Sequence, residues 1–142
     1  DMGEARRKNI RLRSLVKDVT DEVRAGNGVK DLWDAVRPLA DALDASRLEL
    51  RLERQREGNR DGLTFETQRP AGSALPLEVF LDVKSGDERL GRFTIAWSDG
   101  RAEINRDEEL ALELVADAVG DRAAKLLARA DADPQRVVAL RR

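Results

Sequence analysis

The side chains of this chain that could carry out chemistry are carboxylates and hydroxyls, and their spacing favours structural roles. Three consecutive acids, Asp107-Glu108-Glu109, could in principle form a metal site or an acid pair. Neighbouring helix positions point in different directions, so the pattern favours a helix N-terminus whose dipole these acids compensate. The serines have no His as a partner base and would need a lysine in a motif that is not visible; they are Ser46, Ser73, Ser85 and Ser98.

The residue types that are missing exclude most catalytic chemistry. With no His and no Cys in 142 residues, the chain cannot supply a thiol nucleophile, an imidazole base, a Ser-His triad, or the nitrogen and sulfur ligands of zinc and haem. We therefore predict no catalytic residue, no metal site and no cofactor, and we expect that this chain is not an enzyme. Charged residues at 38% and hydrophobic residues at 41% are typical of one globular domain.

Charge is balanced over the chain but unevenly distributed along it. Lys and Arg number 26 and Asp and Glu 28, a net charge of −2, which argues against a nucleic-acid partner. Acids dominate residues 107–121, whereas cations dominate residues 1–17. The early cations are either a juxtamembrane cluster, as the positive-inside rule predicts for a cytoplasmic segment, or a solvated helix face: Arg6, Arg7, Lys8, Arg11 and Arg13.

Nothing in the sequence marks a secreted or membrane-spanning chain. It contains no signal peptide and no apolar run long enough to cross a bilayer. The absence of Cys fits a reducing compartment, so we expect a cytoplasmic location. The first residue is Asp1 rather than Met, and we expect the chain to be part of a longer protein that could tether it to the inner face of the plasma membrane.

Two helices are predicted before residue 45. Apolar residues spaced by three and four predict a helix over residues 4–25, ended by Gly26-Asn27-Gly28. A second helix over residues 29–44 contains Pro38, which should kink it. Read as heptads, the apolar residues of the first helix could form a parallel dimeric coiled coil or could pack on the domain's own sheet. The candidate dimer residues are Leu12, Val16, Val19 and Val23.

Alternation with a period of two predicts about five antiparallel strands. They cover residues 47–53, 63–67, 77–84, 90–98 and 101–104. Residues 58–62 and 85–88 are predicted as turns, and Asp99-Gly100 as a hairpin that returns residues 101–104 against the fourth strand. Each strand is apolar on one side and mostly charged on the other, so helices should cover only one face of the sheet.

A long final helix is predicted over residues 106–130. Asn105 and Glu108 are spaced as a capping box, and the basic residues of the second half suit the helix dipole. The order helix, helix, strands, helix predicts an α+β two-layer domain. We divide the chain into an N-terminal basic helix at 1–28, the domain proper at 29–131 and a C-terminal tail at 132–142.

This order of elements resembles the GAF domain, a small sensory fold of phytochromes and phosphodiesterases, and two segments carry the resemblance. One is Arg89-Leu90-Gly91-Arg92-Phe93-Thr94-Ile95, followed after a turn by the acidic helix start Asp107-Glu108-Glu109-Leu110. The other is residues 39–48, which are similar to the second GAF helix running into strand one. The resemblance covers roughly residues 29–130 and implies a GAF-like sheet with helices on one face.

The chain departs from ligand-binding GAF domains, in which long middle insertions roof a pocket over the sheet face opposite the helices. Its connections at residues 68–76 and 85–88 are too short for a roof, so we expect no small-molecule ligand. Phe80 is the one large apolar residue predicted on that face, either packing at a sheet edge or contacting a partner. The face is otherwise charged, unlike a ligand pocket: Arg47, Glu49, Arg51, Glu53, Glu66, Glu78, Asp82, Lys84 and Arg92.

The basic helix start at residues 6–13, leading into a GAF-like domain, resembles the soluble C-terminal appendage of some bacterial membrane sugar-1-phosphate transferases. Those enzymes transfer a UDP-linked amino-sugar phosphate to polyprenyl phosphate for cell-surface polysaccharide synthesis. The resemblance implies a catalytic membrane core upstream and a non-catalytic regulatory or dimerisation domain here, which we expect to be a homodimer. The alternative is a small-molecule-sensing GAF domain of a bacterial signalling protein.

Overall fold

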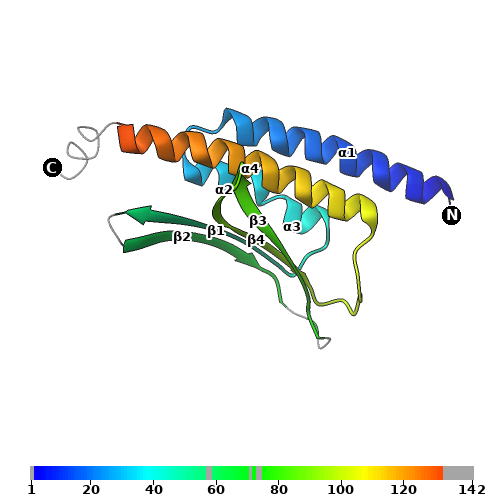
Figure 1. Ribbon diagram of the computed structural model, residues 1–142. Coiled ribbons are helices and arrows are strands. Elements are labelled where there is room, and N and C mark those ends of the chain that lie inside the picture. Colours follow the sequence, from blue (N-terminus) through cyan, green and yellow to red (C-terminus); the bar gives the residue numbers. More distant parts are fainter. Residues whose placement is uncertain (1, 57–58, 71, 73–74, 133–142) are drawn as a thin grey trace.

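The protein is an α+β fold in which helices cover one face of a four-stranded antiparallel sheet (Figure 1). The computed structural model describes residues 2–56, 59–70, 72 and 75–132. The predicted C-terminal tail therefore lies almost wholly outside the described residues. The elements are α1 (Met2–Ala25), α2 (Val29–Val36), α3 (Leu39–Ala42), β1 (Arg47–Arg56), β2 (Asn59–Gln68), β3 (Leu77–Ser85), β4 (Glu88–Trp97) and α4 (Arg106–Ala132).

The core lies between the sheet and the helices and follows from the alternation of the strands. Alternate residues point inward and are buried over Leu48, Leu50 and Leu52 of β1 and over Phe93, Ile95 and Trp97 of β4, with polar or small residues between. α1 contributes to the same core, but it packs mainly against α4 and α2 rather than on the sheet. The largest fully buried side chains are Trp97, Phe93, Leu32, Leu39, Leu48, Leu50, Ile95 and Leu112.

The prediction of a fifth strand at residues 101–104 is wrong, and the strand order explains why. The sheet runs β2-β1-β4-β3, so β4 lies in the interior of the sheet. β4 pairs with β1 along one edge and with β3 along the other. No edge of β4 remains for a hairpin partner after Asp99-Gly100, and the chain instead crosses directly to the start of α4.

Two further boundaries differ from the prediction. The chain reverses direction where the turn was predicted at residues 58–62, but residues 59–62 belong to β2, because β1 and β2 pair continuously up to Arg56 and Asn59. Residue 58 lies outside the described residues. The helix predicted over residues 29–44 is two helices, α2 and α3. Pro38 has no N–H to continue the hydrogen-bond ladder of α2, and it stands instead at the N-cap of α3. The kink expected at Pro38 is an interruption between α2 and α3, across which Arg37 and Pro38 keep right-handed helical backbone angles.

The start and the middle of α4 are each held by a specific local feature. The predicted capping box is confirmed: the Glu108 backbone N–H donates to Asn105 Oδ1 at 2.8 Å, and the Asn105 N–H donates to Glu108 Oε1 at 3.2 Å. Further along, Gly120 lies against the backbone of β3, where a Cβ atom would stand 1.9 Å from the Lys84 carbonyl oxygen. The missing side chain of Gly120 thus sets how closely α4 approaches the sheet.

Candidate functional site

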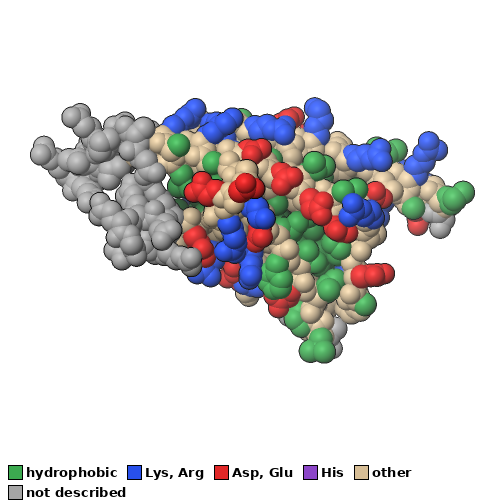
Figure 2. All heavy atoms as spheres, in the orientation of Figure 1, with side chains coloured by type: hydrophobic (Ala, Val, Ile, Leu, Met, Phe, Trp, Pro, Cys, Tyr) green, Lys and Arg blue, Asp and Glu red, His purple; other side chains and the backbone are tan. Residues whose placement is uncertain are grey.

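Five exposed cations lie at the start of α1 and are here called the basic cluster: Arg6, Arg7, Lys8, Arg11 and Arg13. None of the five forms an ion pair with a residue that the structure describes. Their only side-chain hydrogen bond to a described residue is local, from Arg7 Nε to the Gly3 carbonyl at 3.2 Å. Figure 2 shows basic side chains in a row along the outer side of α1. The cluster is therefore available to an anionic partner.

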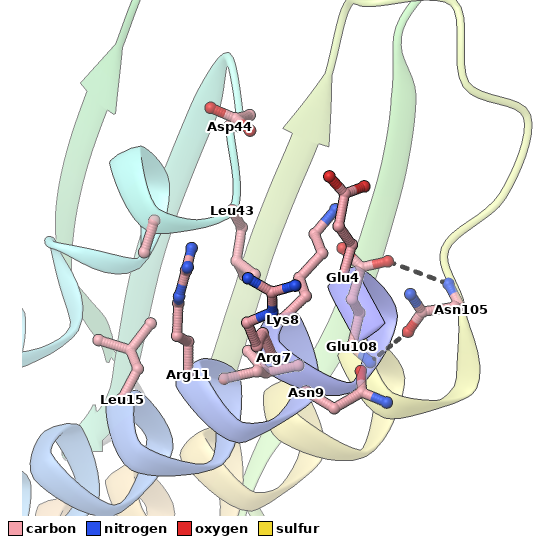
Figure 3. Close-up of a pocket in the computed structure, with 12 residues that line it drawn as sticks. Glu4, Arg7, Lys8, Asn9, Arg11, Leu15, Leu43, Asp44, Asn105 and Glu108 are labelled. Atoms are coloured by element: carbon pink, nitrogen blue, oxygen red, sulfur yellow. Dashed lines mark hydrogen bonds between the residues drawn. The ribbon is translucent and has the colours of Figure 1, made fainter. Parts of the chain in front are cut away.

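A cleft of about 650 Å³ adjoins the basic cluster, between the first turns of α1, the segment after α3 and the start of α4. Arg7, Lys8 and Arg11 line the α1 side, and Leu43, Asp44, Asn105 and Glu108 line the other walls (Figure 3). Asp44 adopts a left-handed backbone conformation with φ of 57°. The walls of the cleft have mixed charge: α1 contributes the three cations together with Glu4, and Asp44 and Glu108 contribute carboxylates from the other walls.

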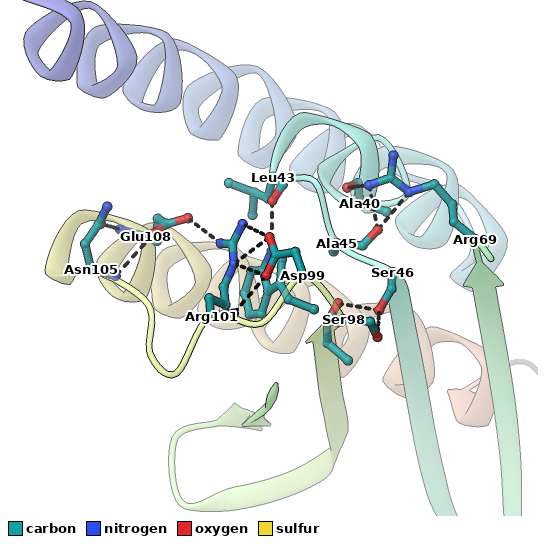
Figure 4. A network of polar contacts seen from close by, with 12 residues as sticks. Ala40, Leu43, Ala45, Ser46, Arg69, Ser98, Asp99, Arg101, Asn105 and Glu108 are labelled. Carbon is teal, nitrogen blue, oxygen red and sulfur yellow. Dashed lines mark hydrogen bonds and ion pairs between the residues drawn. The ribbon is translucent and has the colours of Figure 1, made fainter. Parts of the chain in front are cut away.

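A polar network fixes the wall of this cleft that the sheet and α4 provide (Figure 4). Arg101 pairs with Asp99 at 2.7 Å and with Glu108 at 3.6 Å, and its guanidinium stacks 4.9 Å above the Trp97 ring. The Trp97 indole N–H donates to the Leu43 carbonyl at 2.8 Å. These contacts join β4, α3 and α4, and they leave Glu108 and Arg101 with structural partners.

The hydrogen bonds that Asp99 accepts from Arg101 lower the pKa of its carboxyl to about 2. A carboxyl whose pKa is lowered on folding stabilises the fold above its unfolded pKa, and that contribution is lost as the pH falls through the folded value. We therefore expect Asp99→Asn to lower the melting temperature at neutral pH. The difference from the parent chain should shrink as the pH falls from about 4 to about 2. A constant difference across that range, measured by thermal circular dichroism, would contradict this role of Asp99.

Several of the other polar candidates from the sequence have structural partners, and Ser73 lies outside the described residues. Ser46 Oγ donates to the Ala96 carbonyl at 3.2 Å and lies 3.0 Å from Ser98 Oγ, which ties the start of β1 to the end of β4. Glu108 belongs to the capping box, and Glu109 pairs with Arg106 at 3.1 Å. Within the described residues, no group of three or more acidic side chains is placed to hold a metal ion.

The candidate dimer residues of α1 face the interior of the same chain. Val16, Val19 and Val23 belong to the buried core, and Leu12 is partly buried against it. A second helix could reach the three valines only if α1 left α4 and α2. The predicted dimer therefore needs a surface other than this apolar stripe.

The open face of the sheet carries the predicted charged residues, and these largely neutralise one another. Arg47 pairs with both Glu49 and Glu66, and Arg89 lies 3.1 Å from Asp82. The hydrogen bond with Arg47 lowers the pKa of the Glu66 carboxyl. Phe80 lies on β3, which is an edge strand, and packs beneath the Arg92 guanidinium at 4.7 Å from the ring centroid. The ion pairs and the packing of Phe80 under Arg92 are typical of a solvent-exposed sheet face whose charges are paired within the chain.

Comparisons with known proteins identify no relative of the chain. No family model matches it, and no curated protein is similar to it in sequence. Among the described residues, no helix is long and apolar enough to cross a membrane. The function therefore has to be argued from the surface of the molecule.

Proposed function

We propose that this chain is a non-catalytic, GAF-like regulatory and dimerisation domain that lies against the inner face of a membrane. In this proposal it is the cytoplasmic C-terminal part of a bacterial membrane glycosyl-1-phosphate transferase. The parent enzyme would transfer a UDP-linked amino-sugar phosphate to polyprenyl phosphate, with its catalytic groups in another part of the chain. The observation that carries the proposal is the basic cluster, exposed and without ion-pair partners among the described residues.

A membrane surface fits the basic cluster better than a nucleic acid does. The cytoplasmic leaflet has a negative surface potential, and each nearby Lys or Arg contributes about 1 kcal/mol of attraction. Two apolar side chains, Met2 at 89% and Ile10 at 59% exposure, stand beside the cations on α1 and could enter the headgroup region. A nucleic acid would need cations over a longer surface, and the outer face of α4 is acidic instead.

The cleft beside the cluster supports the same partner. Arg7, Lys8 and Arg11 line it from one side, at a spacing that lets three cations approach one phosphate group. The polar network around Arg101 holds the opposite wall in place. An anionic lipid headgroup is therefore the ligand that this end of the domain is best suited to meet.

The experiment that tests the membrane placement is co-sedimentation with vesicles of phosphatidylglycerol and phosphatidylcholine in equal parts. Neutralising the basic cluster by changing all five cations to Gln should weaken binding by about 100-fold or more, given about 1 kcal/mol for each cation near the surface. Binding of the parent chain should also weaken as salt rises, because salt screens exposed charges.

A matched control changes five cations elsewhere, Lys30, Arg37, Lys84, Lys125 and Arg129, to Gln. This variant has the same net charge as the first but keeps the basic cluster, so it should bind vesicles nearly as well as the parent chain. An equal loss of vesicle binding in the two variants would show that binding depends on the net charge of the chain and not on the basic cluster. Absence of binding by the parent chain at low salt would contradict the membrane placement.

A further inference from the structure

A shallow groove runs along the outer surface between α1 and α4. It has a volume of about 230 Å³ and is lined by Asn9, Leu12, Arg13 and Val16 from α1 and by Asp107, Leu110, Ala111 and Leu114 from α4. Leu110 and Leu114 are 40% and 56% exposed, one helical turn apart on the same side of α4. Leucines left uncovered in this way on a helix mark a contact surface.

The two edges of this groove carry opposite charges. On α1, cations spaced by seven, four and seven follow one edge of the helix: Arg6, Arg13, Lys17 and Arg24. On α4, Asp107, Asp117 and Asp121 flank the two leucines. Lys17 pairs with Asp21 of α1 itself at 3.6 Å, and no ion pair joins the four cations to these acids of α4 within the described part of the chain. Figure 2 shows the basic row on α1 above acidic and apolar side chains over α4.

We propose that the α1–α4 groove docks a second copy of this chain, with α1 of each copy lying on α4 of the other. The pairing covers Leu110 and Leu114 with the partner's α1 and places each basic edge against an acidic edge. One surface thus supplies both halves of a self-complementary contact, as a two-fold dimer requires. This inference deepens the proposed function, and it rests on that proposal for its biological meaning.

The direction of the helices and their charges together select one geometry. α1 and α4 run parallel, with both N-terminal ends on the same side of the molecule (Figure 1). If the two-fold axis ran perpendicular to the helices within the contact plane, α1 of one copy would lie on α1 of the other, and cations would oppose cations. If the axis runs parallel to the helices, α1 of one copy lies on α4 of the other, and cations oppose acids. The second arrangement keeps all four helices parallel, so the two basic clusters lie at the same end of the dimer.

This geometry suits two chains that meet one membrane. Arg6 and Arg13 would contact the partner, while Arg7, Lys8 and Arg11 of both copies would face the same anionic surface, which adds the attraction of the two copies. The arrangement also explains the burial of the predicted heptad residues. Val16, Val19 and Val23 hold α1 to its own chain, while the outer edge of α1 contacts the partner.

Sedimentation equilibrium of three charge variants tests both the dimer and its geometry. The first, Arg13→Glu with Arg24→Glu, and the second, Asp117→Lys with Asp121→Lys, should each raise the dimer dissociation constant about tenfold or more, because like charges then oppose. The third combines all four changes in one chain. If α1 of one copy lies on α4 of the other, this variant again places opposite charges against each other. The dissociation constant of its dimer should then return toward that of the parent chain.

The outcomes separate the candidate arrangements. A combined variant that stays monomeric, although it melts like the parent chain by circular dichroism, would overturn the α1-on-α4 arrangement. A parent chain that remains monomeric at high micromolar concentration would overturn the dimer. Vesicle binding is measured on the same samples. A monomer that binds vesicles would contradict the dimer, both here and in the proposed function, but would leave the membrane placement standing. A dimer that does not bind vesicles would contradict only the membrane placement.

Discussion

Replacing Gly120 with Ala is expected to destabilise the fold by about 2–4 kcal/mol, the reverse of the usual effect of this change in a helix. Alanine normally stabilises a helix interior by about 1 kcal/mol relative to glycine. At this position the new methyl group would stand 1.9 Å from the Lys84 carbonyl oxygen and 2.9 Å from the Lys84 nitrogen. Both atoms belong to the backbone of β3, so α4 must move away from the sheet and loosen its packing.

Urea unfolding followed by far-ultraviolet circular dichroism measures this effect, and Gly62→Ala is the matched control. A Cβ at Gly62 would meet the Leu52 carbonyl oxygen at 3.7 Å, an ordinary van der Waals distance. The control should therefore change stability by less than about 0.5 kcal/mol. A Gly120→Ala protein as stable as the parent would show that α4 does not approach β3 as closely as described.

Replacing Trp97 with Phe is expected to cost about 3 kcal/mol. The change removes the indole N–H that donates to the Leu43 carbonyl at 2.8 Å, in a side chain with no exposed surface. An unpaired buried carbonyl costs about 1–3 kcal/mol, and the smaller ring leaves a void that adds to the loss. The stacking surface beneath Arg101 also shrinks.

Trp33→Phe separates the hydrogen bond from the loss of ring size. Trp33 is also buried and stacks on Phe65 with ring centroids 5.9 Å apart, but its indole N–H has no hydrogen bond to a described residue. Its replacement should cost about 1 kcal/mol, mainly in packing. Equal costs for the two substitutions, measured by urea unfolding, would contradict a stabilising role for the contact between Trp97 and Leu43.

Local patterns in the sequence were sufficient for most of the elements. The spacing of Asn105 and Glu108 predicted a capping box that the structure contains, and the alternation in β3 predicted which side chains face the core. Helices on one face of an antiparallel sheet also followed from that alternation. These features depend only on residues that are close together in the chain.

The features that could not be predicted depend on contacts between distant segments. Asp99-Gly100 has the local chemistry of a hairpin, and only the position of β4 between β1 and β3 excludes a returning strand. The apolar stripe of α1 could equally have met a second helix or its own domain, and the packing of Val23 against α4 and α2 is a tertiary outcome. The groove beside Leu110 likewise exists only because α1 and α4 lie together.

The strand order also has a consequence for how the chain folds. β1 and β2 form one hairpin and β3 and β4 another, and each can form early because its partners are adjacent in sequence. The two hairpins are joined only where β1 pairs with β4, in a register that brings Leu48 opposite Ile95. Closing that long loop carries the largest entropic cost. The pairing of β1 with β4, rather than the formation of either hairpin, should therefore set the folding rate.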